Sequence, residues 1–315
     1  MIHKNMANES VFEFVLVGFP GLPEKYHIGF GILIFLIYYL SLCANLTVIL
    51  LIFLKKHLHQ PMYIIILNLA FSDLLFDTST LPNIIAKYWF GAGSMTFAGC
   101  FLQMTIVHTL NSLDSFIITF MAIDRYVAIC KPLRYHAIVS NRFIRISLVV
   151  LYVLALVIGF TVLYLMLGLP YIGSNKVNNL FCSMGAVIGT TYVDPAPTHL
   201  KGYYMSFAVH VSPFFFIIVS YCVIITNICS SIKSSNWNKA FYTCMTHWFV
   251  IVIYYVPRMI VYTFEQIQKP QVDVYISLIC LYTFVPHSTS PIIFCLRNEE
   301  IKRTLKSILK RENNF

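Results

Sequence analysis

Charged residues are scarce in this 315-residue chain. Asp, Glu, Lys and Arg together make up 11% of the sequence, whereas hydrophobic residues make up 58%. A soluble domain usually carries about 25% charged residues. The low charge content and a mean hydropathy of +0.74 therefore exclude an ordinary soluble protein. They indicate that most of the molecular surface faces lipid.

The motifs of the common catalytic and metal centres are also absent. The sequence contains no C-x-x-C pair, no H-E-x-x-H, no phosphate-binding P-loop and no G-x-S-x-G. We therefore expect no enzyme, no cofactor and no metal centre. The net charge of +9 does not indicate nucleic-acid binding, because the basic residues lie mostly at the edges of apolar runs.

The sequence does contain a series of long apolar runs. A membrane-spanning helix needs roughly 20 mostly apolar residues. Seven runs reach that length: 28–54, 62–85, 97–129, 143–167, 200–229, 240–264 and 274–296. Short loops join them, except for one long loop. The sequence therefore predicts an all-α membrane protein, a seven-transmembrane helix bundle.

A short amphipathic segment follows the last apolar run. Apolar residues recur at helical spacing through 298–310, with four basic residues between them. This pattern is typical of a helix that lies on a membrane surface. We expect three parts: an extracellular N-terminus at 1–27, the bundle at 28–296, and a cytoplasmic amphipathic helix and tail at 297–315.

Lysine and arginine residues indicate the orientation of the bundle. With the N-terminus outside, 15 of the 22 basic residues fall on the inner side and the other seven on the outer side. Cytoplasmic loops carry the excess of basic residues in membrane proteins. We therefore expect a multi-pass protein of the plasma membrane with a cytoplasmic C-terminus. A glycosylation sequon at Asn8 agrees with this orientation.

Several ionisable residues lie inside the predicted spans, where contact with lipid costs several kcal/mol. We expect them to face the interior of the bundle and to mark the functional sites. These residues are Asp73, Asp77, His108, Asp114, Asp124, Arg125, His210, His247, Arg258 and His287.

Two cysteines are expected at the extracellular side. Cys100 lies 25 residues before Arg125, which is about 37 Å along a helix and enough to cross the bilayer. The long loop at 169–199 contains Cys182. We expect a disulfide between Cys100 and Cys182, because both would lie in an oxidising compartment. Two free thiols are the alternative.

The order of these motifs resembles that of rhodopsin-like, class A G-protein-coupled receptors. A cysteine of the third span, Cys100, is followed by Asp124-Arg125-Tyr126 and then by the loop cysteine Cys182. The same class carries prolines in its last three spans, as this chain does.

More specific motifs resemble the odorant receptor family. Residues 121–130 read MAIDRYVAIC, close to the family's M-A-Y-D-R-Y-V-A-I-C, and residues 239–247 read KAFYTCMTH, similar to K-A-x-x-T-C-x-x-H. Residues 18–22 read GFPGL and resemble the fish-like, class I branch. The resemblance implies a receptor that binds a small odorant and activates a stimulatory heterotrimeric G protein, which raises cAMP.

One motif departs from the family pattern. The N-P-x-x-Y of the seventh span reads SPIIF here, at residues 290–294. A hydroxyl replaces an amide and a phenol is lost, so we expect a rewired network of interior hydrogen bonds.

The resemblance implies a two-state switch at the inner end of the bundle. Asp124, Arg125 and Tyr126 form it, with Arg125 paired to Asp124 in the inactive state and free to contact a G protein after agonist binding. The inner end of the sixth span contains no carboxylate, so we expect Tyr221 and His247 as the neighbours of Arg125. A membrane-interface anchor is the alternative for Arg125.

The resemblance also implies a polar hub near the middle of the bundle, formed by Asn45, Asp73 and Asp114. In the family reading this hub holds sodium or water. The alternative is a structural cluster whose members hydrogen-bond to one another.

The ligand pocket is expected in the outer half of the bundle. Three candidate residues lie about one turn apart on the third span: His108, Asn111 and Ser112. Arg258 and Tyr262 lie one turn apart on the sixth span. A guanidinium can bind a ligand carboxylate or another strong acceptor. The alternatives for Arg258 are pairing with Glu265 or Asp273, or extension towards the membrane surface.

Two other functions are consistent with seven spans. A ligand-gated channel chemoreceptor would carry rings or rows of like charge, whereas the acids here lie on separate spans at different depths. A non-olfactory class A receptor is disfavoured by the odorant-type motifs and by the absence of an acid near His108. We expect a small odorant, a G protein and membrane lipid as partners.

Overall fold

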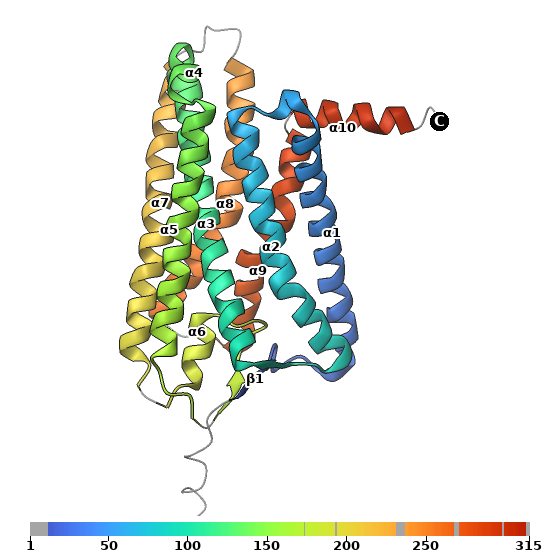
Figure 1. Ribbon diagram of the computed structural model, residues 1–315, viewed down its shortest axis with the longest axis vertical. Coiled ribbons are helices and arrows are strands. Elements are labelled where there is room, and N and C mark those ends of the chain that lie inside the picture. Colours follow the sequence, from blue (N-terminus) through green and yellow to red (C-terminus); the bar gives the residue numbers. More distant parts are fainter. Residues whose placement is uncertain are drawn as a thin grey trace, which may run out of the picture.

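The computed structural model describes residues 12–172, 174–192, 194–230, 237–267, 271–297 and 299–312. Seven long helices form one bundle (Figure 1): α1 (His27–Leu54), α2 (Pro61–Phe90), α3 (Phe97–Cys130), α5 (Asn141–Leu167), α7 (Ala196–Ser230), α8 (Trp237–Ile267) and α9 (Val272–Arg297). The amphipathic helix α10 (Glu299–Glu312) runs across one end of the bundle. The glycosylation sequon at Asn8 lies outside the described residues.

Shorter helical segments lie in the connections. Two are single α-helical turns, α4 (Tyr135–Ile138) and α6 (Met184–Val187). Four are 3-10 turns: η2 (Glu24–Tyr26), η3 (Lys56–Leu58), η4 (Pro132–Arg134) and η5 (Ile188–Thr190). The long loop is therefore partly structured, because α6 and η5 both fall within it.

The seven predicted helices are confirmed, with shifts at their ends. Within the described residues, six of them contain a stretch long and apolar enough to cross a membrane. The remaining one, α8, is the least apolar of the seven. The largest shift is at α2, which continues to Phe90 rather than ending at residue 85 and stops where Gly91 adopts a φ of 70°. A left-handed glycine is a common helix terminator, because it lacks the Cβ that this conformation would strain.

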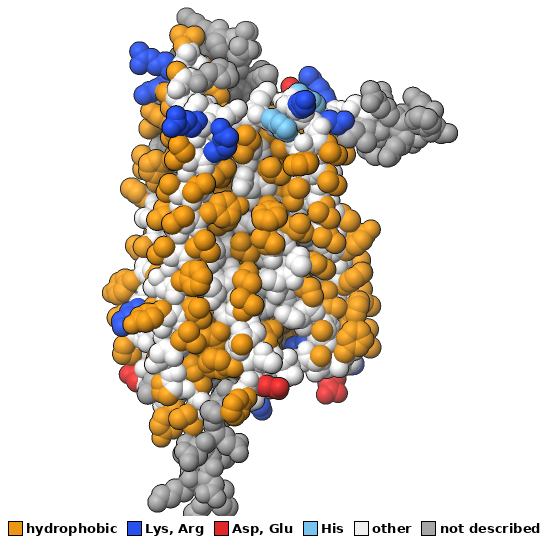
Figure 2. Space-filling model, in the orientation of Figure 1, with side chains coloured by type: hydrophobic (Ala, Val, Ile, Leu, Met, Phe, Trp, Pro, Cys, Tyr) orange, Lys and Arg blue, Asp and Glu red, His pale blue; other side chains and the backbone are white. Residues whose placement is uncertain are grey.

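The outer surface of the bundle is apolar. Figure 2 shows hydrophobic side chains along the sides of the bundle and Lys and Arg side chains gathered at the end that carries α10. Only 22% of the spanning stretch is buried in α1 and in α5, against 61% in α3. Helix α3 is therefore central, and α1 and α5 present most of their residues to the surrounding lipid.

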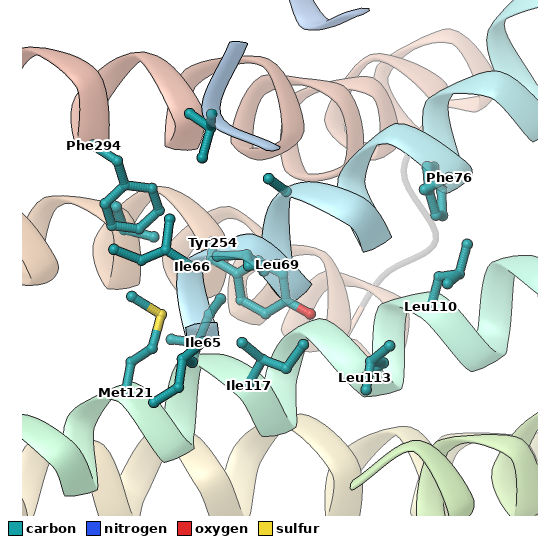
Figure 3. Close-up of a cluster of buried hydrophobic side chains, with 14 of the residues drawn as sticks. Ile65, Ile66, Leu69, Phe76, Leu110, Leu113, Ile117, Met121, Tyr254 and Phe294 are labelled. Carbon is teal, nitrogen blue, oxygen red and sulfur yellow. The ribbon is translucent and has the colours of Figure 1, made fainter. Parts of the chain in front are cut away.

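Apolar side chains from α2, α3, α8 and α9 fill the interior (Figure 3). Ile65 and Leu69 of α2 lie beside Ile117 of α3, and Tyr254 of α8 and Phe294 of α9 complete the cluster. All five are at most 5% exposed. This packing holds the helices that carry the polar residues at fixed separations.

A small sheet closes the end of the bundle opposite α10, and the sequence analysis did not predict it. Strand β1 (Glu13–Leu16) pairs antiparallel with β2 (Ser94–Thr96) and parallel with β3 (Lys176–Val177). The strands are two to four residues long and come from segments distant in sequence. Periodicity cannot reveal such short pairings, so the all-α prediction is correct for the bundle and incomplete for its cap.

An aromatic cluster attaches this sheet to the bundle. Phe14 of β1 is fully buried, and its ring centroid lies 5.6 Å from that of Phe97 and 5.8 Å from that of Tyr171. The predicted disulfide between Cys100 and Cys182 is confirmed and lies in the same buried cluster. Strand β1 is thus part of the folded cap.

Replacement of Phe14 by alanine should loosen this cap. Deleting a buried phenylalanine ring costs about 3–5 kcal/mol, so we expect the purified Phe14→Ala protein to melt several degrees lower than the parent. Phe12→Ala is the matched control, because Phe12 is 78% exposed. Equal melting temperatures for the two variants would contradict a structural role for β1.

Candidate ligand, acid-cluster and switch sites

A polar cavity lies between α3, α7, α8 and α9 towards the capped end of the bundle. All five predicted ligand-binding residues line it: His108, Asn111, Ser112, Arg258 and Tyr262. Its volume is about 60 Å³, and an adjoining cavity of about 100 Å³ shares His108 and Tyr262 with it. Ligand pockets commonly have volumes of about 300–1,000 Å³. Both cavities are smaller than this range, so the space suits only a very small molecule.

Arg258 is the charged residue of this cavity and is only 1% exposed. Its Nη2 donates a hydrogen bond of 2.9 Å to Oδ1 of Asn111. The guanidinium carbon lies 4.2 Å from the ring centroid of Tyr254 and 5.0 Å from that of Tyr282. Two aromatic faces and one amide hold the cation, while Nη1 is buried without a hydrogen-bond partner.

No carboxylate neutralises Arg258 within the described side chains, because none lies within 4.0 Å of its nitrogens. Asp273, one of the proposed partners, instead accepts a hydrogen bond from the backbone N–H of Gly21 at 3.2 Å. The side chain of Glu265, the other proposed partner, lies outside the described side chains. The low exposure of Arg258 also contradicts extension towards the membrane surface.

The long loop forms a lid over the cavity and is attached to α3 at three points. The disulfide joins Cys182 to Cys100. The backbone N–H of Cys182 donates to Oε1 of Gln103 at 2.9 Å, and that of Met184 donates to Nε2 of His108 at 3.2 Å. His108 therefore has a structural partner as well as a place in the cavity wall.

His210 of α7 also lines this cavity, although it was not among the ligand-binding residues predicted from the sequence. Its Nδ1 lies 3.3 Å from the hydroxyl of Tyr262 and 3.0 Å from the carbonyl of Ser206, whereas its Nε2 is buried without a partner. In the sequence, the signal for a role of His210 was its position as an ionisable residue inside an apolar span. Its proximity to Arg258 depends on how α7 packs against α8, which the sequence does not specify.

A second polar group, here called the acid cluster, lies deeper in the bundle and comprises Asp73, Asp77, Asp114 and His287. Nδ1 of His287 lies 3.2 Å from Oδ1 of Asp77, and Nε2 lies 3.5 Å from Oδ2 of Asp114 and 3.8 Å from Oδ1 of Asp73. All four residues are at most 2% exposed. The structure thus brings together Asp73 and Asp114, as predicted for the hub.

Asn45 joins the acid cluster through the backbone. Its Nδ2 donates to the carbonyl of His287 at 3.2 Å and to the carbonyl of Ser41 at 3.1 Å. The hydroxyl of Ser41 in turn donates to Oδ2 of Asp77. The hub prediction omitted Asp77 and His287, although Asp77 follows Asp73 by one helical turn and hence lies on the same face.

The residues predicted to form the switch lie at the opposite end of α3. Nη2 of Arg125 donates to Oδ2 of Asp124 at 2.9 Å, and the hydroxyl of Tyr135 donates to Oδ1 of the same carboxylate at 2.7 Å. Burial and the adjacent Asp124 raise the pKa of the Tyr135 phenol, so this hydroxyl remains a donor at neutral pH. Tyr135 was not predicted from the sequence, because its hydrogen bond to Asp124 depends on the turn η4 before it.

Two further residues predicted for the switch come from other helices. Tyr221 of α7 is 3% exposed and His247 of α8 is 5% exposed. The ring centroid of Tyr221 lies 5.7 Å from that of Trp248, and the ring centroid of His247 lies 6.0 Å from that of Phe294. Tyr126, the third member of the D-R-Y motif, is partly buried on α3.

Removal of the amide that holds Arg258 should destabilise the capped half of the bundle. A hydrogen bond to a charged group contributes about 1.5–3 kcal/mol, so we expect Asn111→Ala to lower the free energy of unfolding by that amount. Chemical denaturation of the purified protein measures the change. Asn227→Ala is the control, because Asn227 is exposed and donates to a carbonyl of its own helix. An unchanged stability of Asn111→Ala would show that the Arg258 contact contributes nothing.

Comparison with known proteins adds independent information. A family model described as "Olfactory receptor" matches residues 34–312. Olfactory receptor 51E2 of Mus musculus is 33% identical over 301 residues, which cover 94% of this chain and 93% of that protein. Olfactory receptor 1500 of Rattus norvegicus is 31% identical over 95% of each chain. Olfactory receptor 11H6 of Homo sapiens is 31% identical over 97% of this chain and 92% of its own length.

Proposed function

Because the chain belongs to the olfactory receptor family, we propose that Arg258 and the cavity around it form the odorant site and that Asp124 and Arg125 form the G-protein switch. Family membership makes the protein an odorant-binding, multi-pass membrane receptor and not an enzyme. We further propose the roles of individual residues, the class of ligand and the orientation in the membrane.

The observation that carries the ligand proposal is the buried guanidinium of Arg258. A buried cation is costly unless it is paired, and no described carboxylate lies within 4.0 Å of it. A ligand carboxylate that accepts from the unpartnered Nη1 would supply the missing charge. The small cavity favours a short-chain acid with an apolar tail against Met205 and Val209.

The distribution of charge supports an N-terminus outside the cell. Basic residues gather at the end that carries α10 (Figure 2), which is where cytoplasmic loops and anionic lipid would meet the protein. The disulfide between Cys100 and Cys182 lies at the opposite end, as an oxidising compartment requires. The odorant cavity then opens towards the outside and Arg125 faces the G protein.

Helix α8 provides a route from the cavity to the switch. Tyr254 donates to the backbone carbonyl of Asn111 at 2.8 Å, and the hydroxyl of Tyr255 lies 2.8 Å from that of Ser115. These bonds and Arg258 tie α8 to α3. A ligand that draws Arg258 away from Asn111 would favour a bundle in which α8 moves outward, since a ligand shifts an equilibrium by its differential affinity for the two states.

The ligand proposal predicts a selective loss of response to acids. In cells that express the receptor with a stimulatory Gα subunit, short carboxylic acids should raise cAMP, and Arg258→Ala should raise their half-maximal concentration roughly 10- to 150-fold, because a hydrogen bond to a charged group contributes about 1.5–3 kcal/mol. Arg258→Lys should retain part of the response, since lysine keeps the positive charge but lacks the planar guanidinium that can donate two hydrogen bonds to one carboxylate.

The control for this experiment is Lys176→Ala, which removes an exposed cation of the extracellular cap, with surface expression measured for every variant. Alcohols, aldehydes and amines are applied in parallel. If acids are silent, or if they act equally on Arg258→Ala, the anionic site is wrong. A ligand-gated current that persists without G protein and survives Arg125→Ala would instead favour the channel alternative.

The switch proposal predicts that substitutions of two neighbouring residues have opposite effects on cAMP signalling. Asp124→Asn removes the charge that holds Arg125 at 2.9 Å, so we expect basal cAMP to rise several-fold, within the limit set by a pair worth about 1.5–3 kcal/mol. Arg125→Ala should abolish the agonist response. Tyr164→Phe, on an exposed residue of α5, is the control. Unchanged basal cAMP in Asp124→Asn would remove Asp124 from the switch.

A further inference from the structure

The acid cluster contains more negative charge than its own contacts neutralise. Asp73, Asp77 and Asp114 surround the single imidazole of His287, and no described lysine or arginine nitrogen lies within 4.0 Å of the three carboxylates. Even a protonated imidazole would balance only one of three ionised acids. Four side-chain atoms of these residues are buried without hydrogen-bond partners: Oδ2 of Asp73, both carboxylate oxygens of Asp114 and Nε2 of His287.

A sodium ion, which the family resemblance implies for this hub, does not fit the donor set well. Hard cations take oxygen ligands, whereas imidazole nitrogen is a ligand for zinc, copper, iron and nickel. Here Nε2 of His287 occupies one side of the centre, with carboxylate oxygens of Asp73 and Asp114 on the others. Imidazole nitrogen and carboxylate oxygen are both ligand types that Zn²⁺ takes in proteins.

We propose that Asp73, Asp114 and His287 bind a divalent transition-metal ion of the Zn²⁺ class. Each residue offers one ligand atom, and the three atoms lie within 4.8 Å of one another. In a tetrahedral site with bonds of about 2.1 Å, ligand atoms lie about 3.4 Å apart. The separations from Nε2, 3.5 Å to Asp114 and 3.8 Å to Asp73, need only a small contraction.

The neighbours of His287 prepare it as a ligand. Nδ1 lies 3.2 Å from Oδ1 of Asp77, and a hydrogen bond from Nδ1–H to this carboxylate places the lone pair on Nε2, which faces the centre. Asp77 is held in turn by the hydroxyl of Ser41. A carboxylate behind a ligating histidine is the usual outer arrangement of protein zinc sites, where it fixes the tautomer and raises the basicity of the ligand.

The odorant cavity lies next to this site. Thr283 lines that cavity and lies one helical turn before His287, and Ser112 lines it two residues before Asp114. The hydroxyl Oγ1 of Thr283 is buried without a partner. The metal site and the odorant site are therefore adjacent but use different residues.

Zinc binding to the purified receptor tests this inference without reference to signalling. The receptor is placed in lipid nanodiscs, treated with a chelator and dialysed against Zn²⁺ in buffers that contain sodium or potassium chloride. We expect one tightly bound Zn²⁺ per receptor in both buffers and a rise in melting temperature with Zn²⁺ concentration. Bound Co²⁺ should show the visible absorption of a low-symmetry site.

Substitutions around the centre should weaken Zn²⁺ binding by different amounts. His287→Gln and Asp73→Asn remove ligand atoms and should weaken Zn²⁺ binding at least about 100-fold. Asp77→Asn removes only the outer carboxylate and should weaken it about 10- to 100-fold, the range seen for such partners. His247→Gln is the matched control, a buried histidine outside the cluster, and should bind as the parent does.

Three results would overturn the proposal. They are the absence of stoichiometric Zn²⁺ at micromolar concentration, binding that His287→Gln leaves unchanged, and displacement of Zn²⁺ by sodium at extracellular concentration. The second result would assign the metal to surface histidines and the third would restore a sodium site. None of them bears on the odorant or G-protein proposals, because the readouts are metal content, melting temperature and absorption.

Discussion

The free-energy cost of placing a charged side chain against lipid determines where the polar residues of this bundle lie. An ionised side chain that faces hydrocarbon is expensive, and the side of the bundle seen in Figure 2 is mostly apolar. Charged groups in the spans therefore lie between helices, where other polar side chains must compensate them. Arg258 is compensated by two tyrosine rings and one amide. The acid cluster has fewer compensating contacts, since several of its polar atoms have no partner.

Helix α3 connects the three polar regions. Cys100 attaches the long loop at the capped end, Asn111 holds Arg258, Asp114 belongs to the acid cluster and Asp124 holds Arg125 at the other end. Its central position makes this possible, because it has the most buried spanning stretch among the described spans. Residues of the cavity, of the acid cluster and of the Asp124–Arg125 pair therefore lie on one helix.

Particular residues show where sequence reasoning succeeded and where it stopped. The disulfide followed from the placement of two cysteines on one side of the membrane. The five ligand candidates do line one cavity, because helical spacing relates residues on the same helix. His210 and His287 were recognised only as ionisable residues inside spans. Their partners lie on other helices, and the rotation of one helix against another is a property of packing.

The sequence by itself determined the class of fold, the number of spans, the residues that must avoid lipid and the family. Each of these depends on local composition, on helical period or on short motifs in a fixed order. Only the tertiary structure decided that Phe14 belongs to a buried cap, that Arg258 has no described carboxylate partner and that His287 meets three aspartates. Those facts depend on contacts between segments far apart in the chain, which become defined only when the helices pack.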